Sequence, residues 1–278
     1  FEIVNLLYQI LHYTIGLMKK IILTSVFSIL MMFAVNAGTD GENKLSKNNP
    51  ENVKDCFEGL NRATFKFNNA LDSAIIEPLA KVYKVLPNPV RTGVSNSLNN
   101  LSNLVTIPNN ILQGDFNKAG ENTLRLIVNT TVGILGIFDV ANSLGLSEYE
   151  KEDYGQSLGS MGVGPGCYIV LPILGPSTVR DTAGSVVSVI GGDAWYNITV
   201  KEDTHYVTDF DYYASRAGTG IDFRAKNIDS FENLEKNSLD FYASVKSLYL
   251  QDRLQKVLNS KKIVETQDDS DWEEIENQ

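Results

Sequence analysis

The chain has 278 residues, of which 43% are hydrophobic and 21% charged, and its formal net charge is −10. This length supports one sizeable hydrophobic core and no more than two domains. The negative charge and the lack of a Lys and Arg cluster argue against a general nucleic-acid-binding protein, because phosphate binding needs clustered cations.

The N-terminal part of the sequence is typical of a secretory leader. A positive end at Met18–Lys20 precedes an apolar run at 21–35, and Val35–Ala37 supplies a small-residue cleavage site. The alternative is an uncleaved anchor helix, although 21–35 is short for a helix that spans a bilayer. We therefore predict an over-called start at 1–17, a signal peptide at 18–37 and a polar linker at 38–54.

The cysteines indicate how the chain is processed after export. Bacterial lipoproteins carry a cysteine directly after the apolar run, and this sequence has none there. The two cysteines, Cys56 and Cys167, lie far apart in the chain. In an oxidising compartment they form either one disulfide or two free thiols, and their spacing does not decide between these.

The folded part reads as a series of helices punctuated by single Gly or Pro residues. Strand-like alternation is nearly absent, apart from a short run at Cys167–Leu171. Apolar spacing and breakers predict helices at Asn61–Ile76, from Pro78 through Tyr83, from Val90 to Val105 with a break at Pro108, at Phe116–Thr131 and at Ser230–Leu258. We expect residues 55–260 to form one helical domain.

The middle third of the chain is much less charged than its flanks. Tyr154–Val179 contains no charged residue but many Gly and Pro, so it predicts a bent segment rather than a straight helix. Leu126–Phe138 is a second uncharged run and predicts a buried or interfacial helix. These segments suit either a soluble core with polar turns or a protein lying in one leaflet of a bilayer.

One stretch matches a catalytic motif. Gly155–Gly159 fits the G-x-S-x-G nucleophile elbow, with Ser157 as nucleophile, His205 as base and Asp181 or Asp193 as orienting acid. The flanking sequence lacks the strand and helix that an elbow requires. No metal-ligand spacing and no phosphate-binding loop occur, so we predict neither a metal nor a cofactor. The acidic segment at 261–278 predicts a disordered, solvated tail.

Several segments, in order along the chain, carry motifs of one known family. They are Glu58–Arg62, Phe67–Asn68, Pro89–Asn96, Gln113–Asp115, Asn129–Ala141, Tyr154–Gly159, Gly162–Gly164, Tyr168, Leu171–Pro172, Leu174–Ser177 and Arg180–Asp181. On these residues the chain resembles the MlaA (VacJ) proteins from about Phe57 to Leu258. The resemblance implies an all-α ring of short amphipathic helices with a Gly/Pro-rich apolar hairpin and a central channel.

The resemblance also implies a function and partners. Proteins of this family remove phospholipids from the outer leaflet of the Gram-negative outer membrane and pass them to the periplasmic carrier MlaC, without enzymatic chemistry. They lie in the inner leaflet of that membrane, on its periplasmic side, and bind trimeric porins. Because the lipid-accepting cysteine is missing here, anchoring would depend on the apolar ring or on a retained signal. A periplasmic serine esterase and a soluble structural protein are the alternatives.

Candidate residues follow from the resemblance and from the uncharged hairpin. We expect a lipid path or membrane hairpin to contain Gly162, Val163, Gly164, Gly166, Tyr168, Val170, Leu171, Pro172, Leu174 and Gly175. We expect structural roles for the family-motif residues Asn61, Arg62, Asn68, Arg91, Asn129, Asp139, Arg180 and Asp181. A bridge between Cys56 and Cys167 would tie the first helix to the hairpin.

Overall fold

The computed structural model describes residues 53–197, 200 and 208–260. All of these residues belong to one compact unit. The predicted leader at 1–37, nearly all of the linker, the tail at 261–278 and His205 lie outside the described residues.

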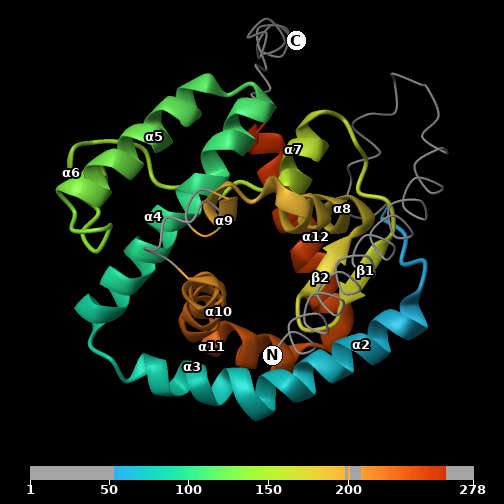
Figure 1. Ribbon diagram of the computed structural model, residues 1–278. Helices are drawn as coiled ribbons and strands as arrows, with labels where there is room; N and C mark the ends of the chain where they lie inside the picture. Colours follow the sequence, from blue (N-terminus) through green and yellow to red (C-terminus); the bar gives the residue numbers. More distant parts are fainter. Residues whose placement is uncertain (1–52, 198–199, 201–207, 261–278) are drawn as a thin grey trace, which may run out of the picture. The chain divides into compact units, whose positions relative to one another are not determined.

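Helices dominate the described unit, which also has one two-stranded sheet (Figure 1). This confirms the predicted all-helical class, apart from the hairpin. The first half contains α2 (Glu58–Leu71), η4 (Asp72–Ile76), α3 (Glu77–Lys84), α4 (Asn88–Gln113), α5 (Phe116–Thr131) and α6 (Val140–Ser143). The second half contains α7 (Tyr154–Ser160), β1 (Tyr168–Leu171), β2 (Gly175–Thr178), α8 (Val179–Val187), η5 (Ser188–Gly192), α9 (Ala194–Tyr196), α10 (Asp209–Lys226), α11 (Ile228–Asn237) and α12 (Phe241–Ser260).

The first helical segment runs without a break from α2 through η4 into α3 (Figure 1). The η4 turn is a π-helix, in which the Glu77 amide donates to the Asp72 carbonyl five residues earlier. Pro78 follows at once and has no amide hydrogen to donate. A widened turn accommodates a proline that would disrupt a regular α-helix, which explains how the segment stays continuous.

The helix α4 corrects one prediction. Pro108 does not end the helix, which continues to Gln113 and stops at Gly114 with a φ of 80°. The turn around Pro108 keeps a side-chain hydrogen bond, because Asn109 Nδ2 donates to the Val105 carbonyl at 2.8 Å. The left-handed conformation at Gly114 is a frequent end for a helix, since glycine has no Cβ to clash there.

The predicted strand at Cys167–Leu171 is confirmed as β1, and it pairs with β2 in a hairpin of the kind that the family resemblance implies. In this antiparallel hairpin Tyr168 lies opposite Thr178 and Leu171 lies opposite Gly175. One face of the hairpin packs between α2 and α12. The buried cluster there consists of Phe65, Tyr168, Val170, Tyr242 and Leu250.

The end of the domain also differs from expectation. Instead of one helix over Ser230–Leu258, the chain forms α11 and α12 with an extended residue, Ser238, between them. Asp240 starts the second helix, because its Oδ1 accepts a hydrogen bond from the Ala243 amide at 3.2 Å. This is the geometry of an N-cap, which favours a new helix over continuation of the old one.

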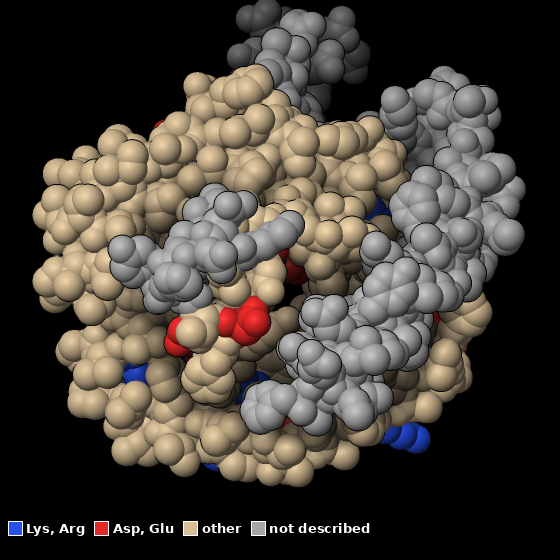
Figure 2. All heavy atoms as spheres, in the orientation of Figure 1, with Lys and Arg blue, Asp and Glu red and all other residues tan. Residues whose placement is uncertain are grey.

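Apolar side chains remain exposed along much of the described unit. Exposed examples on separate elements include Val82 (71%), Phe116 (70%), Leu135 (71%), Leu174 (74%) and Val189 (85%). In Figure 2 uncharged residues cover most of the face in view. Within the described ranges, no helix combines the length and the hydropathy that crossing a membrane requires.

Candidate functional site

The β1–β2 hairpin contains most of the residues predicted to form a lipid path, but their side chains lie in two environments. Tyr168 is fully buried and Val170 is 4% exposed, both in the core cluster with α2 and α12. Both residues thus belong to the hairpin, and protein covers their side chains. Leu174 and Val163 are exposed, at 74% and 45%. The exposed part also includes Gly162, Gly164, Gly166 and Pro172, while Leu171 and Gly175 are half-buried.

Two asparagines of α2 bind the free edge of β1. Asn61 donates from Nδ2 to the Tyr168 carbonyl at 3.0 Å and accepts at Oδ1 from the Val170 amide at 2.9 Å. About two helical turns further along α2, Asn68 donates to the Leu171 carbonyl at 2.9 Å and accepts from the Ile173 amide at 2.8 Å. Each side-chain amide thus replaces the neighbouring strand that an edge strand lacks.

A disulfide joins Cys56 to Cys167, with 5.6 Å between the α-carbons. The sequence had left a bridge and two free thiols as alternatives. Cys56 lies just before Phe57, the N-cap residue of α2, and Cys167 directly precedes β1. The Tyr168 amide also donates to the Lys54 carbonyl at 2.9 Å. The start of the domain is therefore attached to the hairpin both covalently and by the backbone.

A second polar anchor lies at the start of α12. Arg62 binds both carboxylate oxygens of Asp240, at 2.7 and 3.2 Å, and its guanidinium lies 4.3 Å from the centre of the Tyr242 ring. The Tyr242 hydroxyl donates to Asp55, and burial together with this carboxylate raises the pKa of Tyr242. Arg62 therefore holds α2 against α12 beside the hairpin.

A buried ion cluster joins α7, α8 and α12. Asp181, 7% exposed, accepts hydrogen bonds from Arg253 Nη2 at 2.8 Å, Arg180 Nε at 3.0 Å and the Tyr249 hydroxyl at 2.7 Å. Arg253 also binds Asp153, the N-cap residue of α7. Burial alone would raise the pKa of Asp181, but the charge and hydrogen bonds of Arg253 outweigh burial, and the pKa is lowered.

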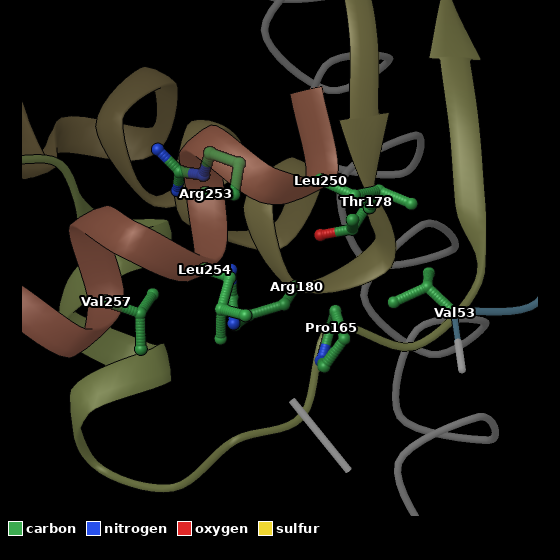
Figure 3. A pocket seen from close by; sticks show the side chains of 8 residues that line it. All are labelled: Val53, Pro165, Thr178, Arg180, Leu250, Arg253, Leu254 and Val257. Carbon is green, nitrogen blue, oxygen red and sulfur yellow. The ribbon is translucent and has the colours of Figure 1, made fainter. Parts of the chain in front are cut away.

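A small cavity lies beside this cluster, and it is too small for a lipid. Its walls come from α12, the end of β2 and the loop before β1 (Figure 3). The cavity has a volume of about 20 Å³, which is room for roughly one water molecule. Its lining residues are Val53, Pro165, Thr178, Arg180, Leu250, Arg253, Leu254 and Val257. We therefore assign Arg180 and Arg253 to holding the helices together.

Close helix packing explains the Gly155–Gly159 motif. A Cβ on Gly155 would lie 2.6 Å from Asp181 Oδ1, and one on Gly159 would lie 2.7 Å from Val257 Cγ2. Both glycines are inside the short helix α7, so no nucleophile elbow exists there. Ser157 is 2% exposed and donates to Asn109 Oδ1 at 2.7 Å. The motif thus serves contact with α8 and α12, and the base proposed for it, His205, lies outside the described residues.

The long helix α4 has its polar side buried and apolar residues exposed. Exposed apolar residues include Val90 (48%), Val94 (38%), Ile111 (50%) and Leu112 (47%). The buried polar residues of the helix are Ser95, Asn100, Ser102, Asn103, Thr106, Asn109 and Asn110. Asn110 Oδ1 accepts from Asn122 Nδ2 of α5 at 2.8 Å, so the polar side contributes to helix packing. Val105 is the one hydrophobic side chain among the buried residues of α4, whereas a helix in water usually buries mostly hydrophobic side chains.

The uncharged run Leu126–Phe138, predicted to be a buried or interfacial helix, is helical only as far as Thr131. The remainder forms a turn that exposes Val132 (66%), Ile134 (58%) and Phe138 (58%). Ile134 has a φ of 53°, a left-handed conformation that β-branched residues rarely adopt. A strained turn with exposed apolar side chains points to a functional contact.

Comparison with known proteins identifies the family. The sequence model described as MlaA lipoprotein matches residues 53–256. The chain belongs to the MlaA family. A Haemophilus influenzae relative, named intermembrane phospholipid transport system lipoprotein MlaA, is 32% identical over 90% of this chain and 94% of its own length. An uncharacterized Rickettsia bellii protein is 36% identical over 72% of this chain and 76% of its own.

A solved structure agrees with this assignment. It is described as the structural basis for maintenance of bacterial outer membrane lipid asymmetry. It is 33% identical, with a TM-score of 0.61, and the match covers 73% of this chain and 99% of that one. The MlaA relatives are thus named as parts of an intermembrane phospholipid transport system, and the helical fold is shared with the solved structure.

The remaining MlaA motif residues brace the turns between helices. Asn129 donates to Asp139 Oδ1 at 2.9 Å and accepts from the Ala141 amide at 2.9 Å. Asp139 also binds Arg125 Nη1 at 2.7 Å and caps α6. Arg91 donates to the Leu86 carbonyl at 3.0 Å, which secures the turn before α4. Arg125 is 3% exposed and was not among the predicted structural residues, because its partner Asp139 is fourteen residues away in the sequence.

Proposed function

We propose that this chain moves phospholipids without enzymatic chemistry. It takes molecules that have strayed into the outer leaflet of a Gram-negative outer membrane and passes them to the periplasmic carrier MlaC. The helices form a ring that lies in the inner leaflet, with a channel for the lipid headgroup. Membership of the MlaA family, with relatives named for intermembrane phospholipid transport, supports this function.

The observation that carries the proposal is the reversed polarity of α4. A headgroup crossing hydrocarbon without hydrogen-bond partners costs several kcal/mol, of the order found for burying an unpaired polar group. A protein embedded in a leaflet needs apolar side chains outward and polar groups inward. Val90, Val94 and Ile111 on the outside of α4, with asparagines inside, meet this requirement.

The exposed apolar turns would supply membrane contact. The turn at 132–138 and the hairpin tip at Ile173 and Leu174 expose apolar side chains on different elements. Insertion of such side chains would hold the protein at the leaflet. Trimeric porins are the expected membrane partners, as the family resemblance implies.

Substitutions of Leu135 test both the proposed phospholipid transport and the insertion of the turn at 132–138 into the membrane. Deleting the gene should increase phospholipid in the outer leaflet, measured by labelling ethanolamine headgroups with an impermeant amine reagent. Wild-type protein and Leu135→Ala should restore the low level. Leu135→Glu should restore it poorly and should shift the protein toward the soluble fraction, because a carboxylate at membrane depth costs about 2.5–3.5 kcal/mol.

Two results would contradict the proposal. An unchanged amount of outer-leaflet phospholipid in the deletion strain would contradict the proposed transport function. If Leu135→Glu is as abundant as Leu135→Ala and keeps full activity and membrane association, this turn is not embedded in the membrane.

A further inference from the structure

We infer that the groove between α3 and α11 binds the headgroup of a zwitterionic phospholipid of the ethanolamine class and selects it over anionic phospholipids. This inference rests on the proposed lipid transport and adds a substrate preference to it. The groove has a volume of about 380 Å³. It is lined by Lys81, Lys84, Val85, Ile228, Asp229 and Glu232.

The charges of the groove are paired and exposed. Lys84 Nζ lies 3.1 Å from Asp229 Oδ2, and Lys81 Nζ lies 3.8 Å from Glu232 Oε1. Each member of the longer pair also has a nearer partner on its own helical segment, since Lys81 binds Glu77 at 2.5 Å and Lys236 binds Glu232 at 3.2 Å. Side-chain exposure is 40% for Lys84 and 82% for Asp229. Ion pairs as exposed as these contribute little to stability and exchange partners readily. A ligand carrying both charges can therefore insert between the two rows.

A phosphoethanolamine headgroup has the matching charges. Its phosphate would bind the ammonium groups of Lys81 and Lys84, and its own ammonium would bind the carboxylates of Asp229 and Glu232. A phosphatidylglycerol headgroup offers the same phosphate but no cation. It would bring an added negative charge next to both carboxylates of the groove without a cation to offset it, which disfavours binding.

The surface beside the groove is apolar, which fits a lipid better than a free headgroup. Leu79, Val82 and Val85 are exposed by 47%, 71% and 82%. At 3.6 residues per turn these three side chains occupy the arc of α3 next to the arc of Lys81 and Lys84. Acyl chains can follow this arc while the headgroup stays between the charged rows. The buried side chain of Ile228, which is 4% exposed, also lines the groove.

The test uses the purified full-length protein and vesicles of equal parts phosphatidylethanolamine and phosphatidylglycerol. Bound lipid is extracted after re-isolation of the protein, and each class is quantified by mass spectrometry. Wild-type protein should enrich phosphatidylethanolamine about fivefold, as expected for two exposed charge contacts near the middle of their usual range of strength. The variant Asp229→Asn with Glu232→Gln should lose this enrichment while binding as much total lipid.

The control variant is Glu235→Gln with Asp252→Asn, which changes the net charge equally but lies outside the groove. It should keep the wild-type ratio. Bound lipid in the input ratio with wild-type protein, or an unchanged ratio in the groove variant, would overturn the selectivity and leave transport intact. Absence of any bound lipid would overturn both proposals. Soluble phosphoethanolamine that competes as well as the lipid would assign the groove to a free headgroup instead.

Discussion

At the scale of single residues, the hairpin edge depends on the side-chain amide of Asn61. The variant Asn61→Ala leaves the buried Tyr168 carbonyl and the buried Val170 amide without the hydrogen bonds that Asn61 makes to them. We expect a loss of about 2–4 kcal/mol in the free energy of unfolding, from two unsatisfied buried groups. Urea denaturation followed by circular dichroism measures this.

The matched control for Asn61 is Asn68→Ala. Asn68 makes the same pair of bonds, but the Ile173 amide that it accepts from is exposed and can bind water instead. Its loss should cost about 1 kcal/mol. Equal destabilisation by the two variants would contradict the view that burial, rather than the bonds alone, makes Asn61 important.

At the scale of helices and strands, the disulfide is the strongest local constraint. It closes a loop with a sequence separation of 111 residues. Replacing both Cys56 and Cys167 with alanine should lower the free energy of unfolding by about 4–5 kcal/mol if loop entropy dominates. Thermal unfolding with and without reductant measures this, and the wild-type protein should change its gel mobility on reduction. A reductant effect equally large in the alanine variant would exclude the bridge as its cause.

Apolar spacing predicted most helices, because the hydrophobic face of a helix is formed by residues three or four positions apart in the sequence. Phe116–Thr131 coincides with α5, and Asn61–Ile76 lies within the first helical segment. The helix boundaries that were predicted wrongly depend on contacts between residues distant in sequence. The continuation of α4 past Pro108 depends on packing against α5 and on side-chain bonds within the turn. The break before α12 depends on Asp240, which Arg62 binds from a helix 178 residues away in sequence.

The candidate site was predicted less well than the fold. The Gly and Pro content of Tyr154–Val179 indicated a bent segment, and the structure contains a short helix, a loop and a hairpin there. Composition did not reveal which side chains the hairpin buries. Tyr168 and Val170 alternate with half-buried neighbours, and the residues that bury them, Phe65 and Leu250, come from the two ends of the domain.

At the scale of the whole described unit, the Asp181 cluster makes stability depend on acid pH. The pKa of Asp181 is lower in the folded protein than its ordinary value of about 3.8. The unfolded chain therefore takes up a proton first as the pH falls, and stability is lost below about pH 4. Above that value the contribution of Asp181 is complete and does not vary.

The variant Asp181→Asn tests this dependence. It should be less stable than the wild type at pH 7, since Arg253 and Arg180 lose a buried partner. The difference between the two proteins should shrink as the pH falls from 5 toward 2, measured by urea denaturation at each pH. A difference that stays constant over this range would show that Asp181 does not titrate with unfolding.

The link between Cys56 and Cys167 also determines how the molecule responds to mechanical force. A pull applied to the chain before Val53 passes through the sulfur bridge to β1 and does not load α2 directly. The segment between the two cysteines, which includes α4 and α5, then carries no tension, and extension can come only from residues outside the bridge. The helices that present the reversed polar side of α4 are therefore shielded from any strain that an anchor places on the start of the domain.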